Sequence, residues 1–329
     1  MAARRPARAR RARCPRGRLH RVPGPAASGA DQSGRRARRG PDHASGRRAA
    51  RLLRLTPVEA SPFGKGRGKV LHWEDHVPSG AAGRPVLLLH GLGSSGEDWL
   101  LQTAAIGERR RVVTPDLPGH GRTPGFRHWP RLPDYARPVR ALVERLDLAP
   151  LHVVGLSLGG AVALQLAVEA PALPVSLVLV SSFARFRTTP RGALRGLLRV
   201  GLAAAGRMDA VGRWVAADLF PSPDQAALRA TAAGRLAANR RGDYLRALWA
   251  VARFDVRSRL AEIRCPTLVI AGGADRTVPL EAQRRMARSI PGARLVVLPG
   301  AGHAAPVDNA PMFNDVVVGF LAEVDRLRG

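Results

Sequence analysis

A serine flanked by glycines occupies a position that suits a nucleophile. The segment Gly155-Leu156-Ser157-Leu158-Gly159 follows the apolar run LHVVGL and precedes the small-residue helical pattern AVALQLAVEA. This spacing between a strand and a helix predicts a sharp turn that exposes the serine hydroxyl. The free N–H groups at the start of the following helix favour negative charge. A serine hydroxyl is a weak nucleophile, so the same chemistry requires a neighbouring base.

A histidine and an aspartate follow Ser157 in the chain order that acyl transfer by a serine requires. Of the nine histidines, His303 alone comes after Ser157, and it lies in the Gly-rich segment Pro299-Gly300-Ala301-Gly302-His303. Asp275 follows the apolar run TLVIAG, whereas the competing position after VSLVLVS offers no acid. We therefore predict that Ser157 is the nucleophile, that His303 is the general base and that Asp275 holds the imidazole in the correct tautomer.

Two backbone N–H groups are expected to stabilise the oxyanion that forms during acyl transfer. One belongs to Leu158, directly after the nucleophile, and the other to Leu92, in the segment His90-Gly91-Leu92-Gly93. We interpret His90 itself as a structural residue that bonds this loop. The predicted mechanism requires no metal ion and no organic cofactor.

The elements that must position these residues begin at about residue 69. From there, short apolar runs alternate with helical patterns, which predicts an α/β fold with a mostly parallel central sheet flanked by helices. Runs such as VLLLH and TLVIAG are apolar throughout, as expected for strands that are covered on both faces. We predict strands at residues 69–73, 85–90, 111–116, 151–156, 175–181, 267–272 and 294–299, and helices at 135–146, 159–170, 280–289 and 312–327.

The strand pattern stops between about residues 183 and 255, which predicts a helical lid inserted between two strands of the 69–329 domain. Leu194, Leu197, Leu198 and Leu202 recur there at helical spacing, and they suit either a pocket lining or packing between helices. Five arginines near the start of the lid suit an anionic acyl chain or carrier, but the sequence favours a solvated helix face. They are Arg185, Arg187, Arg191, Arg195 and Arg199.

The positive charge is concentrated at the N-terminus. Residues 1–55 contribute +15 of the formal net charge of +28, and they show no helical or strand periodicity. We interpret this segment as a disordered basic tail without catalytic role or as an overextended start, in preference to a transit peptide or a nucleic-acid-binding arm. Because no aromatic residue precedes Phe63, nothing there is suited to stack on bases. We expect no nucleic-acid partner.

Cysteine use and hydropathy bear on the cellular compartment and on membrane insertion. Only Cys14 and Cys265 occur, which gives no disulfide framework or zinc cluster and fits a reducing cytoplasm. No run of 18 apolar residues is present, so no membrane span is expected.

From about Val70 to Leu327 the chain resembles the α/β-hydrolase superfamily. The shared motifs are His90-Gly91-Leu92-Gly93, the loop Asp116-Leu117-Pro118-Gly119-His120-Gly121-Arg122, the turn at Ser157, and the segments GGADRTVP and GAGH. Within the superfamily, the chain looks most like the esterase branch that contains 3-oxoadipate enol-lactonases and pimeloyl carrier-protein ester esterases. The resemblance implies hydrolysis of a small-molecule carboxylic ester or lactone, a pocket between the lid and the turn, and a structural loop at Asp116 and His120.

The residue at position 157 distinguishes some of the other activities known for the same fold. Haloalkane dehalogenases and epoxide hydrolases of this fold use an aspartate there, so Ser157 argues against both. Carbon–carbon bond hydrolases, cofactor-free haloperoxidases and non-catalytic ligand receptors retain the serine, the acid and the histidine. These remain the alternatives to an esterase.

Overall fold

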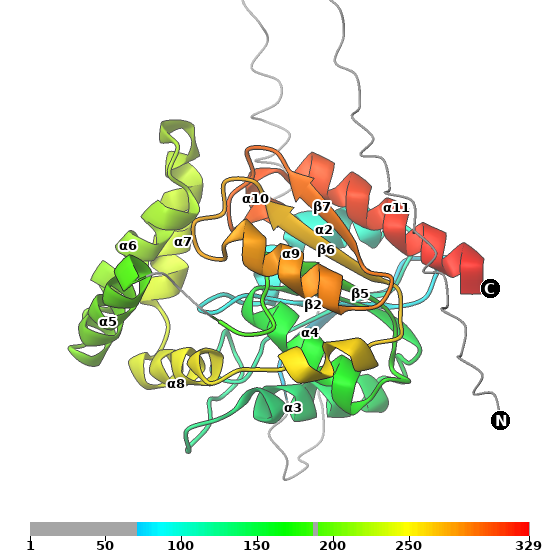
Figure 1. The fold of residues 1–329 in the computed structure, drawn as a ribbon, viewed down its shortest axis with the longest axis horizontal. Helices are drawn as coiled ribbons and strands as arrows, with labels where there is room; N and C mark the ends of the chain where they lie inside the picture. The colour runs from blue at the N-terminus through cyan, green and yellow to red at the C-terminus, as the bar shows by residue number, and fades with distance from the viewer. Residues whose placement is uncertain (1–70, 187–189, 329) are drawn as a thin grey trace, which may run out of the picture. The chain divides into compact units, whose positions relative to one another are not determined.

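The computed structural model describes residues 71–186 and 190–328, and within these residues the chain forms a seven-stranded sheet with helices on both faces (Figure 1). The sheet order is β1-β3-β2-β4-β5-β6-β7. The strands are β1 (Trp73–His76), β2 (Val86–Leu89), β3 (Val112–Pro115), β4 (Leu151–Leu156), β5 (Pro174–Val180), β6 (Thr267–Gly272) and β7 (Arg294–Leu298). The predicted fold class is confirmed. The basic tail predicted for residues 1–55 lies outside the described residues.

All strands except the first run parallel. β1 pairs antiparallel with β3, with Trp73 opposite Pro115, whereas β3, β2, β4, β5, β6 and β7 form successive parallel pairs. The prediction places the first strand at residues 69–73, whereas β1 covers Trp73–His76; residues 69 and 70 lie outside the described part of the chain. The residues of this edge strand alternate between half-buried and exposed, so its polar sequence WEDH gave no apolar run to detect.

The apolar strands are explained by their two covered faces. Leu87 and Leu89 of β2 belong to one hydrophobic core, while the intervening Val86 and Leu88 belong to another on the opposite face. Successive side chains of a strand point to opposite faces, so a doubly covered strand must be apolar at every position.

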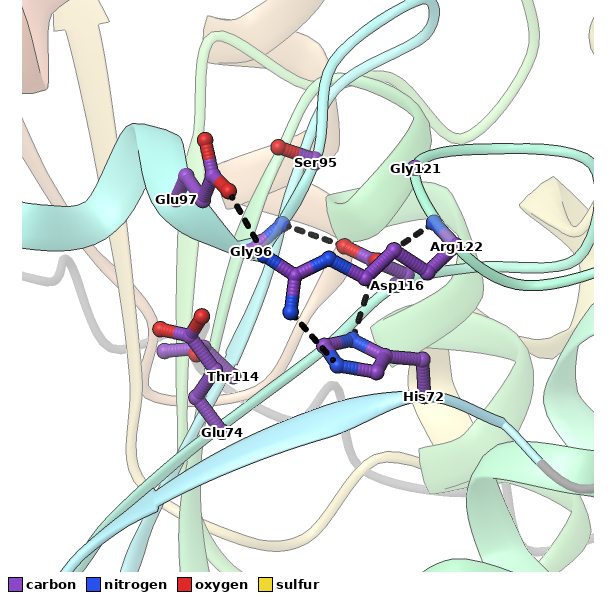
Figure 2. Close-up of a pocket in the computed structure, with 9 residues that line it drawn as sticks. All are labelled: His72, Glu74, Ser95, Gly96, Glu97, Thr114, Asp116, Gly121 and Arg122. Carbon is purple, nitrogen blue, oxygen red and sulfur yellow. Dashed lines mark hydrogen bonds and ion pairs between the residues drawn. The ribbon is translucent and has the colours of Figure 1, made fainter. Parts of the chain in front are cut away.

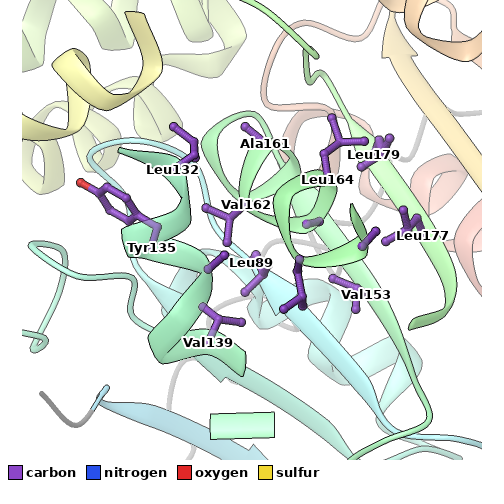
Figure 3. Close-up of a cluster of buried hydrophobic side chains, with 14 of the residues drawn as sticks. Leu89, Leu132, Tyr135, Val139, Val153, Ala161, Val162, Leu164, Leu177 and Leu179 are labelled. Carbon is purple, nitrogen blue, oxygen red and sulfur yellow. The ribbon is translucent and has the colours of Figure 1, made fainter. Parts of the chain in front are cut away.

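Two groups of helices cover the two faces of the sheet. One face carries α3 (Leu132–Arg145), α4 (Leu158–Glu169) and α9 (Leu280–Ser289), and the other carries α2 (Leu100–Ile106) and α11 (Ala310–Arg328). Figure 3 shows how Tyr135 and Val139 of α3 and Val162 of α4 meet strand residues such as Leu89 and Val153. None of the helices in the described residues has the length and apolar content needed to cross a membrane.

A helical insertion separates β5 from β6. It comprises α5 (Pro190–Ala204), α6 (Met208–Leu219), α7 (Ala226–Ala237) and α8 (Arg241–Ala252), with the short 3-10 helices η2 (Pro223–Gln225) and η3 (Arg257–Glu262). It has a small core of its own, formed by Ala203, Met208, Val211, Leu236 and Tyr244. We refer to α5–α8 as the insertion; its function as a lid remains a prediction.

The four leucines predicted for α5 fall into two groups. Leu202 is half-buried and packs against the core of the insertion, which is one of the two roles considered. Leu194, Leu197 and Leu198 are exposed by 59%, 71% and 54%, so they neither pack between helices nor line a buried pocket. On the same helix, Arg195 pairs with Asp218 at 2.7 Å and Arg199 donates to the hydroxyl of Tyr244 at 2.5 Å, so these arginines bind neighbouring helices.

Candidate active site

Ser157 lies in a strained turn between β4 and α4. Its backbone angles are φ 53° and ψ −108°, a region that non-glycine residues rarely adopt. The turn is held by three hydrogen bonds: its N–H donates to the carbonyl oxygen of Val180 at 2.9 Å, and its own carbonyl oxygen accepts from Ala161 N–H at 3.0 Å and from the Ser182 hydroxyl at 3.0 Å. The neighbouring elements therefore fix the strained geometry that the sequence motif predicts.

The two flanking glycines make this turn sterically feasible. A Cβ at Gly155 would overlap the carbonyl oxygen of Gly159, and a Cβ at Gly159 would overlap the carbonyl oxygen of Leu89 at the end of β2. These contacts involve backbone atoms, which cannot rotate away as a side chain can. Both positions therefore require glycine for close approach of the backbone.

Asp275 and His303 lie in hydrogen-bond contact. Nδ1 of His303 is 2.9 Å from Oδ2 of Asp275, and their side chains are 11% and 0% exposed. The other carboxylate oxygen accepts from Thr277 N–H at 2.7 Å and Val278 N–H at 3.0 Å. Because an ionised carboxylate only accepts hydrogen bonds, Nδ1 carries the proton and Nε2 is left with the lone pair that a base requires.

The surroundings of Asp275 favour its charged form. Burial alone would raise the pKa of Asp275, but the charge and hydrogen bond of His303, together with the N–H groups of Val278 and Thr277, outweigh burial and lower the pKa below its ordinary value. A charged Asp275 can stabilise a positively charged imidazole.

The three predicted residues follow parallel strands of the same half of the sheet, at the carboxyl ends of those strands. Ser157 follows β4, Asp275 follows β6 and His303 follows β7, and the carboxyl ends of parallel strands lie together. The structure brings Asp275 and His303 into contact, but among the described residues the Ser157 hydroxyl has no hydrogen bond to either. Hydrogen bonds of this kind are often long in ligand-free sites and shorten when substrate binds.

The two N–H groups predicted for the oxyanion lie beside the turn. Leu158 is the first residue of α4, so its N–H has no acceptor within the helix. Leu92 lies in the loop after β2, where Gly91 approaches the side chain of Leu156, with 3.7 Å between that side chain and a Cβ at position 91. In the described part of the chain, neither N–H donates to another residue.

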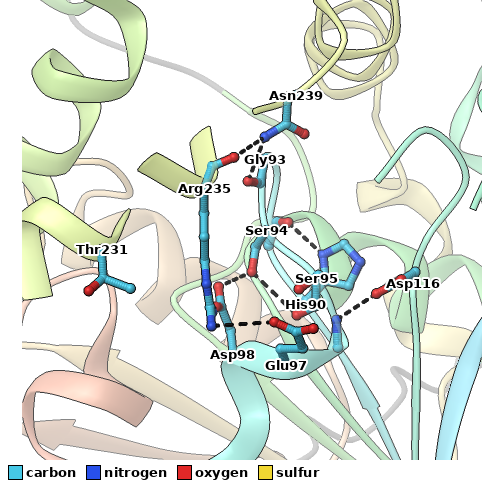
Figure 4. Close-up of polar contacts among 12 residues, drawn as sticks. His90, Gly93, Ser94, Ser95, Glu97, Asp98, Asp116, Thr231, Arg235 and Asn239 are labelled. Carbon is cyan, nitrogen blue, oxygen red and sulfur yellow. Dashed lines mark hydrogen bonds and ion pairs between the residues drawn. The ribbon is translucent and has the colours of Figure 1, made fainter. Parts of the chain in front are cut away.

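The insertion packs directly on the loop that carries Leu92. Figure 4 shows Asn239 donating to the carbonyl oxygen of Gly93, at 2.9 Å, while Arg235 pairs with Asp98. Gly93 has a φ of 80° and lies under Leu236 and Tyr244, and a Cβ there would be 3.3 Å from the Tyr244 ring. Sequence reasoning missed these contacts because they join positions far apart in the chain.

Asp308 is a second site residue that sequence reasoning missed. Its Oδ2 accepts from Gly302 N–H, next to His303, at 2.8 Å, and its Oδ1 is buried without a partner. Burial raises the pKa of Asp308, and the nearby Asp275 charge adds to this effect against the opposing Gly302 hydrogen bond. Asp308 holds the loop that carries the proposed base.

His90 and Asp116 are engaged in structural contacts. His90 Nε2 accepts from Leu117 N–H at 2.9 Å and its Nδ1 contacts the carbonyl oxygen of Gly91 at 2.8 Å, so both nitrogens bond the loop, as predicted. Asp116 accepts from the N–H groups of Gly96 and Arg122, both at 2.8 Å.

His120 is buried beside His90, with 5.2 Å between the ring centroids. Burial, followed by the neighbouring His90, lowers the pKa of His120 to about 3, which keeps its ring neutral.

A small pocket adjoins the loop that contains Asp116 and Arg122 but not the predicted catalytic residues. It has a volume of about 40 Å³ and lies beside β1 and β3. Figure 2 shows the Arg122 guanidinium between Glu97, at 3.3 Å, and His72, at 3.0 Å. His72 also contacts Asp116 at 3.2 Å. In this pocket Arg122, Glu97, His72 and Asp116 thus bond one another, and we assign the pocket no catalytic function.

Comparisons with known proteins agree with this geometry. Residues 86–316 match the family model described as "Alpha/beta hydrolase family". A protein of Variovorax paradoxus assigned as a carbamate hydrolase, RutD, is 35% identical over 77% of this chain and 97% of its own length. A dihydrolipoyllysine-residue acetyltransferase component of an acetoin cleaving system from Pseudomonas putida is 32% identical over 77% of this chain and 67% of its own.

A solved structure is also similar. The enol-lactonase of Burkholderia xenovorans LB400 superposes with a TM-score of 0.71 at 25% identity, covering 77% of this chain and 96% of that protein.

Proposed function

Because this chain belongs to the α/β-hydrolase family, we propose that it is a serine hydrolase that cleaves a small-molecule carboxylic ester or lactone through an acyl-enzyme on Ser157. One observation carries the proposal: a buried carboxylate bonds Nδ1 of a histidine at 2.9 Å at the sheet edge where a serine occupies a strained turn. The similarity to an enol-lactonase supports the same class of substrate.

The mechanism begins with proton transfer from Ser157 to His303. Nε2 of His303 takes the hydroxyl proton as the serine oxygen attacks the substrate carbonyl carbon, and Asp275 stabilises the resulting imidazolium. The carbonyl oxygen becomes an oxyanion, which the N–H groups of Leu92 and Leu158 stabilise. Collapse of this intermediate expels the alcohol, which receives the proton from His303.

Hydrolysis of the acyl-enzyme repeats these steps with water. His303 takes a proton from water, the hydroxide attacks the acyl carbon, and Ser157 leaves with the proton as the acid is released. With a lactone, the expelled alcohol remains attached to the acyl group, so a single hydroxy acid is released.

We propose that the insertion acts as the lid of this site. The support for this proposal is that Asn239 and Leu236 contact Gly93, next to the proposed oxyanion donor Leu92. A substitution in the insertion near Gly93 would alter the space above the substrate carbonyl group, and hence the acyl chain that the site accepts.

A carbamate is the second candidate substrate. The support is the 35% identity to the Variovorax paradoxus protein assigned as a carbamate hydrolase, RutD, over nearly that protein's whole length. A carbamate carbonyl is open to the same attack by Ser157, but its second substituent is nitrogen, so hydrolysis also releases an amine and carbon dioxide.

The cytoplasm is the proposed location. Its support is Cys265, a buried free thiol, which is compatible with a reducing compartment.

The test compares p-nitrophenyl acetate, butyrate and octanoate with a p-nitrophenyl carbamate, using the wild type and Ser157→Ala. We expect wild-type turnover of the esters with an optimum chain length, and none above background for the variant. Faster Ser157-dependent turnover of the carbamate would favour the second candidate. No Ser157-dependent turnover of either would overturn the proposal in favour of carbon–carbon hydrolysis, a haloperoxidase-type reaction or a receptor.

A further inference from the structure

We propose that a cleft between α9, η3 and the segment after β5 binds a small anionic amphiphile, that is, a molecule with a short apolar chain and a carboxylate or phosphate head. The cleft has a volume of about 290 Å³ and is lined by Phe183, Ala184, Arg185, Arg257, Leu260, Ala282, Arg285, Met286 and Ser289. The proposed catalytic residues and oxyanion donors do not line it. We call it the arginine cleft.

The floor of the arginine cleft is apolar and rigid. Phe183, Leu260 and Met286 are 3%, 1% and 2% exposed, so their side chains are fixed in the core and show only their edges to the cleft. The ring of Phe183 packs edge-on against Phe186 and Phe254, with centroids 5.2 and 6.3 Å away. The volume of the cleft, about 290 Å³, lies just below the roughly 300–1,000 Å³ typical of small-molecule sites, which suits a ligand with a short chain.

The charged groups at its rim are all guanidinium groups. Arg185, Arg257 and Arg285 line the cleft, and no acidic residue does. Arg257 holds Asp255 with two bonds of 2.9 and 2.8 Å, and Arg185 lies 3.7 Å from the same carboxylate. Arg285 lies 3.7 Å from Glu281. Three cations therefore face two carboxylates, which leaves a positive excess at the rim.

Two of these arginines have donors free to rearrange toward a ligand. The contacts of Arg185 and Arg285 at 3.7 Å are longer than hydrogen bonds. A guanidinium presents five N–H donors in a planar fork that matches carboxylate and phosphate oxygens. An anionic head between these two side chains would be bound by charge-assisted hydrogen bonds while its chain covers Phe183 and Met286.

The arrangement differs from a solvated arginine surface. Elsewhere, Arg195 and Arg259 are bonded directly to carboxylates on their own surfaces, and neither lines the arginine cleft. In the arginine cleft three segments far apart in the sequence converge, with an apolar floor and cationic rim. That combination favours an amphiphile over a simple inorganic anion, which would gain nothing from the floor.

The helix α9 offers a matched pair of variants for the test. Arg284 and Arg285 both lie 3.7 Å from Glu281 and both are exposed, but only Arg285 lines the cleft. Binding of octanoate, octyl phosphate and 1-octanol is measured by calorimetry on the full chain. We expect both anions to bind, with octanol weaker by about tenfold, and Arg285→Gln to lose about tenfold in affinity while Arg284→Gln is unchanged.

A second measurement locates the ligand. A fatty carboxylate carrying an aliphatic diazirine is photolysed with the wild type, and labelled peptides are identified by mass spectrometry. We expect labels on residues 183–186, 257–263 or 280–289. Labels confined to peptides containing Ser157 or His303, equal losses for the two arginine variants, or octanol binding as tightly as octanoate would each overturn the proposal. Neither measurement depends on ester turnover.

Discussion

Replacing Asp275 by asparagine tests the proposed roles of the acid and the base most directly. The asparagine Oδ1 can retain the bonds from the N–H groups of Thr277 and Val278, at 2.7 and 3.0 Å. Its amide group then faces Nδ1 of His303 at 2.9 Å and must donate to it. The proton of the imidazole therefore moves to Nε2, which directs a donor instead of a lone pair toward Ser157.

The alternative orientation of the amide does not restore the base. It would place NH₂ against the two backbone N–H donors, losing two hydrogen bonds worth about 1 kcal/mol each and leaving buried donors opposed. The imidazolium also loses a full negative charge 2.9 Å away. From the wrong tautomer and this lost charge we expect kcat to fall by roughly 10⁴, or about 5 kcal/mol in activation free energy.

The assay is ester hydrolysis at pH 7 by wild type, Asp275→Asn and the control Asp308→Asn. Asp308 is the neighbouring acid and bonds Gly302 N–H, not the imidazole; an asparagine there keeps an oxygen that can accept this bond and so preserves the loop of His303. We expect Asp308→Asn to retain most activity and both variants to remain folded by circular dichroism. Asp275→Asn with more than about a tenth of wild-type kcat/KM would refute the assignment of Asp275.

Gly159→Ala places a Cβ against the carbonyl oxygen at the end of β2. We expect the free energy of unfolding, measured by thermal unfolding, to fall by about 1–3 kcal/mol and activity to be lost. Gly201→Ala, where a Cβ meets open space, is the control, and equal effects of the two variants would contradict the steric argument. Asn239→Ala removes the donor to Gly93, so KM should rise several-fold with little change in kcat; unchanged KM in steady-state assays would separate the insertion from substrate binding. Burial lowers the pKa of His152 from 6.5 to about 4, so the folded state disfavours its protonation. The free energy of unfolding is therefore highest above pH 6.5 and falls by about 3 kcal/mol as the pH drops from 6.5 toward 4. Urea unfolding at pH 7, 5.5 and 4.5 should show this decrease, and a flat profile for the wild type would contradict it.

The sequence predicted the elements whose environment is uniform. Strands such as β2 and β6 are covered on both faces, so their apolar runs indicate both type and position. Local rules also apply to the turn at Ser157, because its glycines are required by backbone atoms only a few residues away. The order serine, aspartate, histidine then selected the two residues that the structure places in contact.

The features that were missed depend on distant contacts. The edge strand β1 is half exposed and carries no apolar run, and the outward leucines of α5 show the same helical spacing that buried ones would. Asp308 and Asn239 gain their roles only through backbone groups of other segments. The arginine cleft likewise joins three segments whose arginines are indistinguishable in sequence from the many others.

The separate core of the insertion divides the chain into two parts that differ in how readily they open. Its five buried residues form a far smaller apolar cluster than those on the two sides of the sheet. Helix α8 also contributes Ala247, Ala250 and Val251 to the core beside the sheet, so it is the amides of α5–α7 that should exchange with solvent through local opening, well before those of the strands. Mutations in α5–α7 can accordingly remodel this part of the insertion with little effect on the strands that precede Ser157, Asp275 and His303. Under the proposed function, acceptance of a new substrate can therefore arise at little cost to the stability of the sheet.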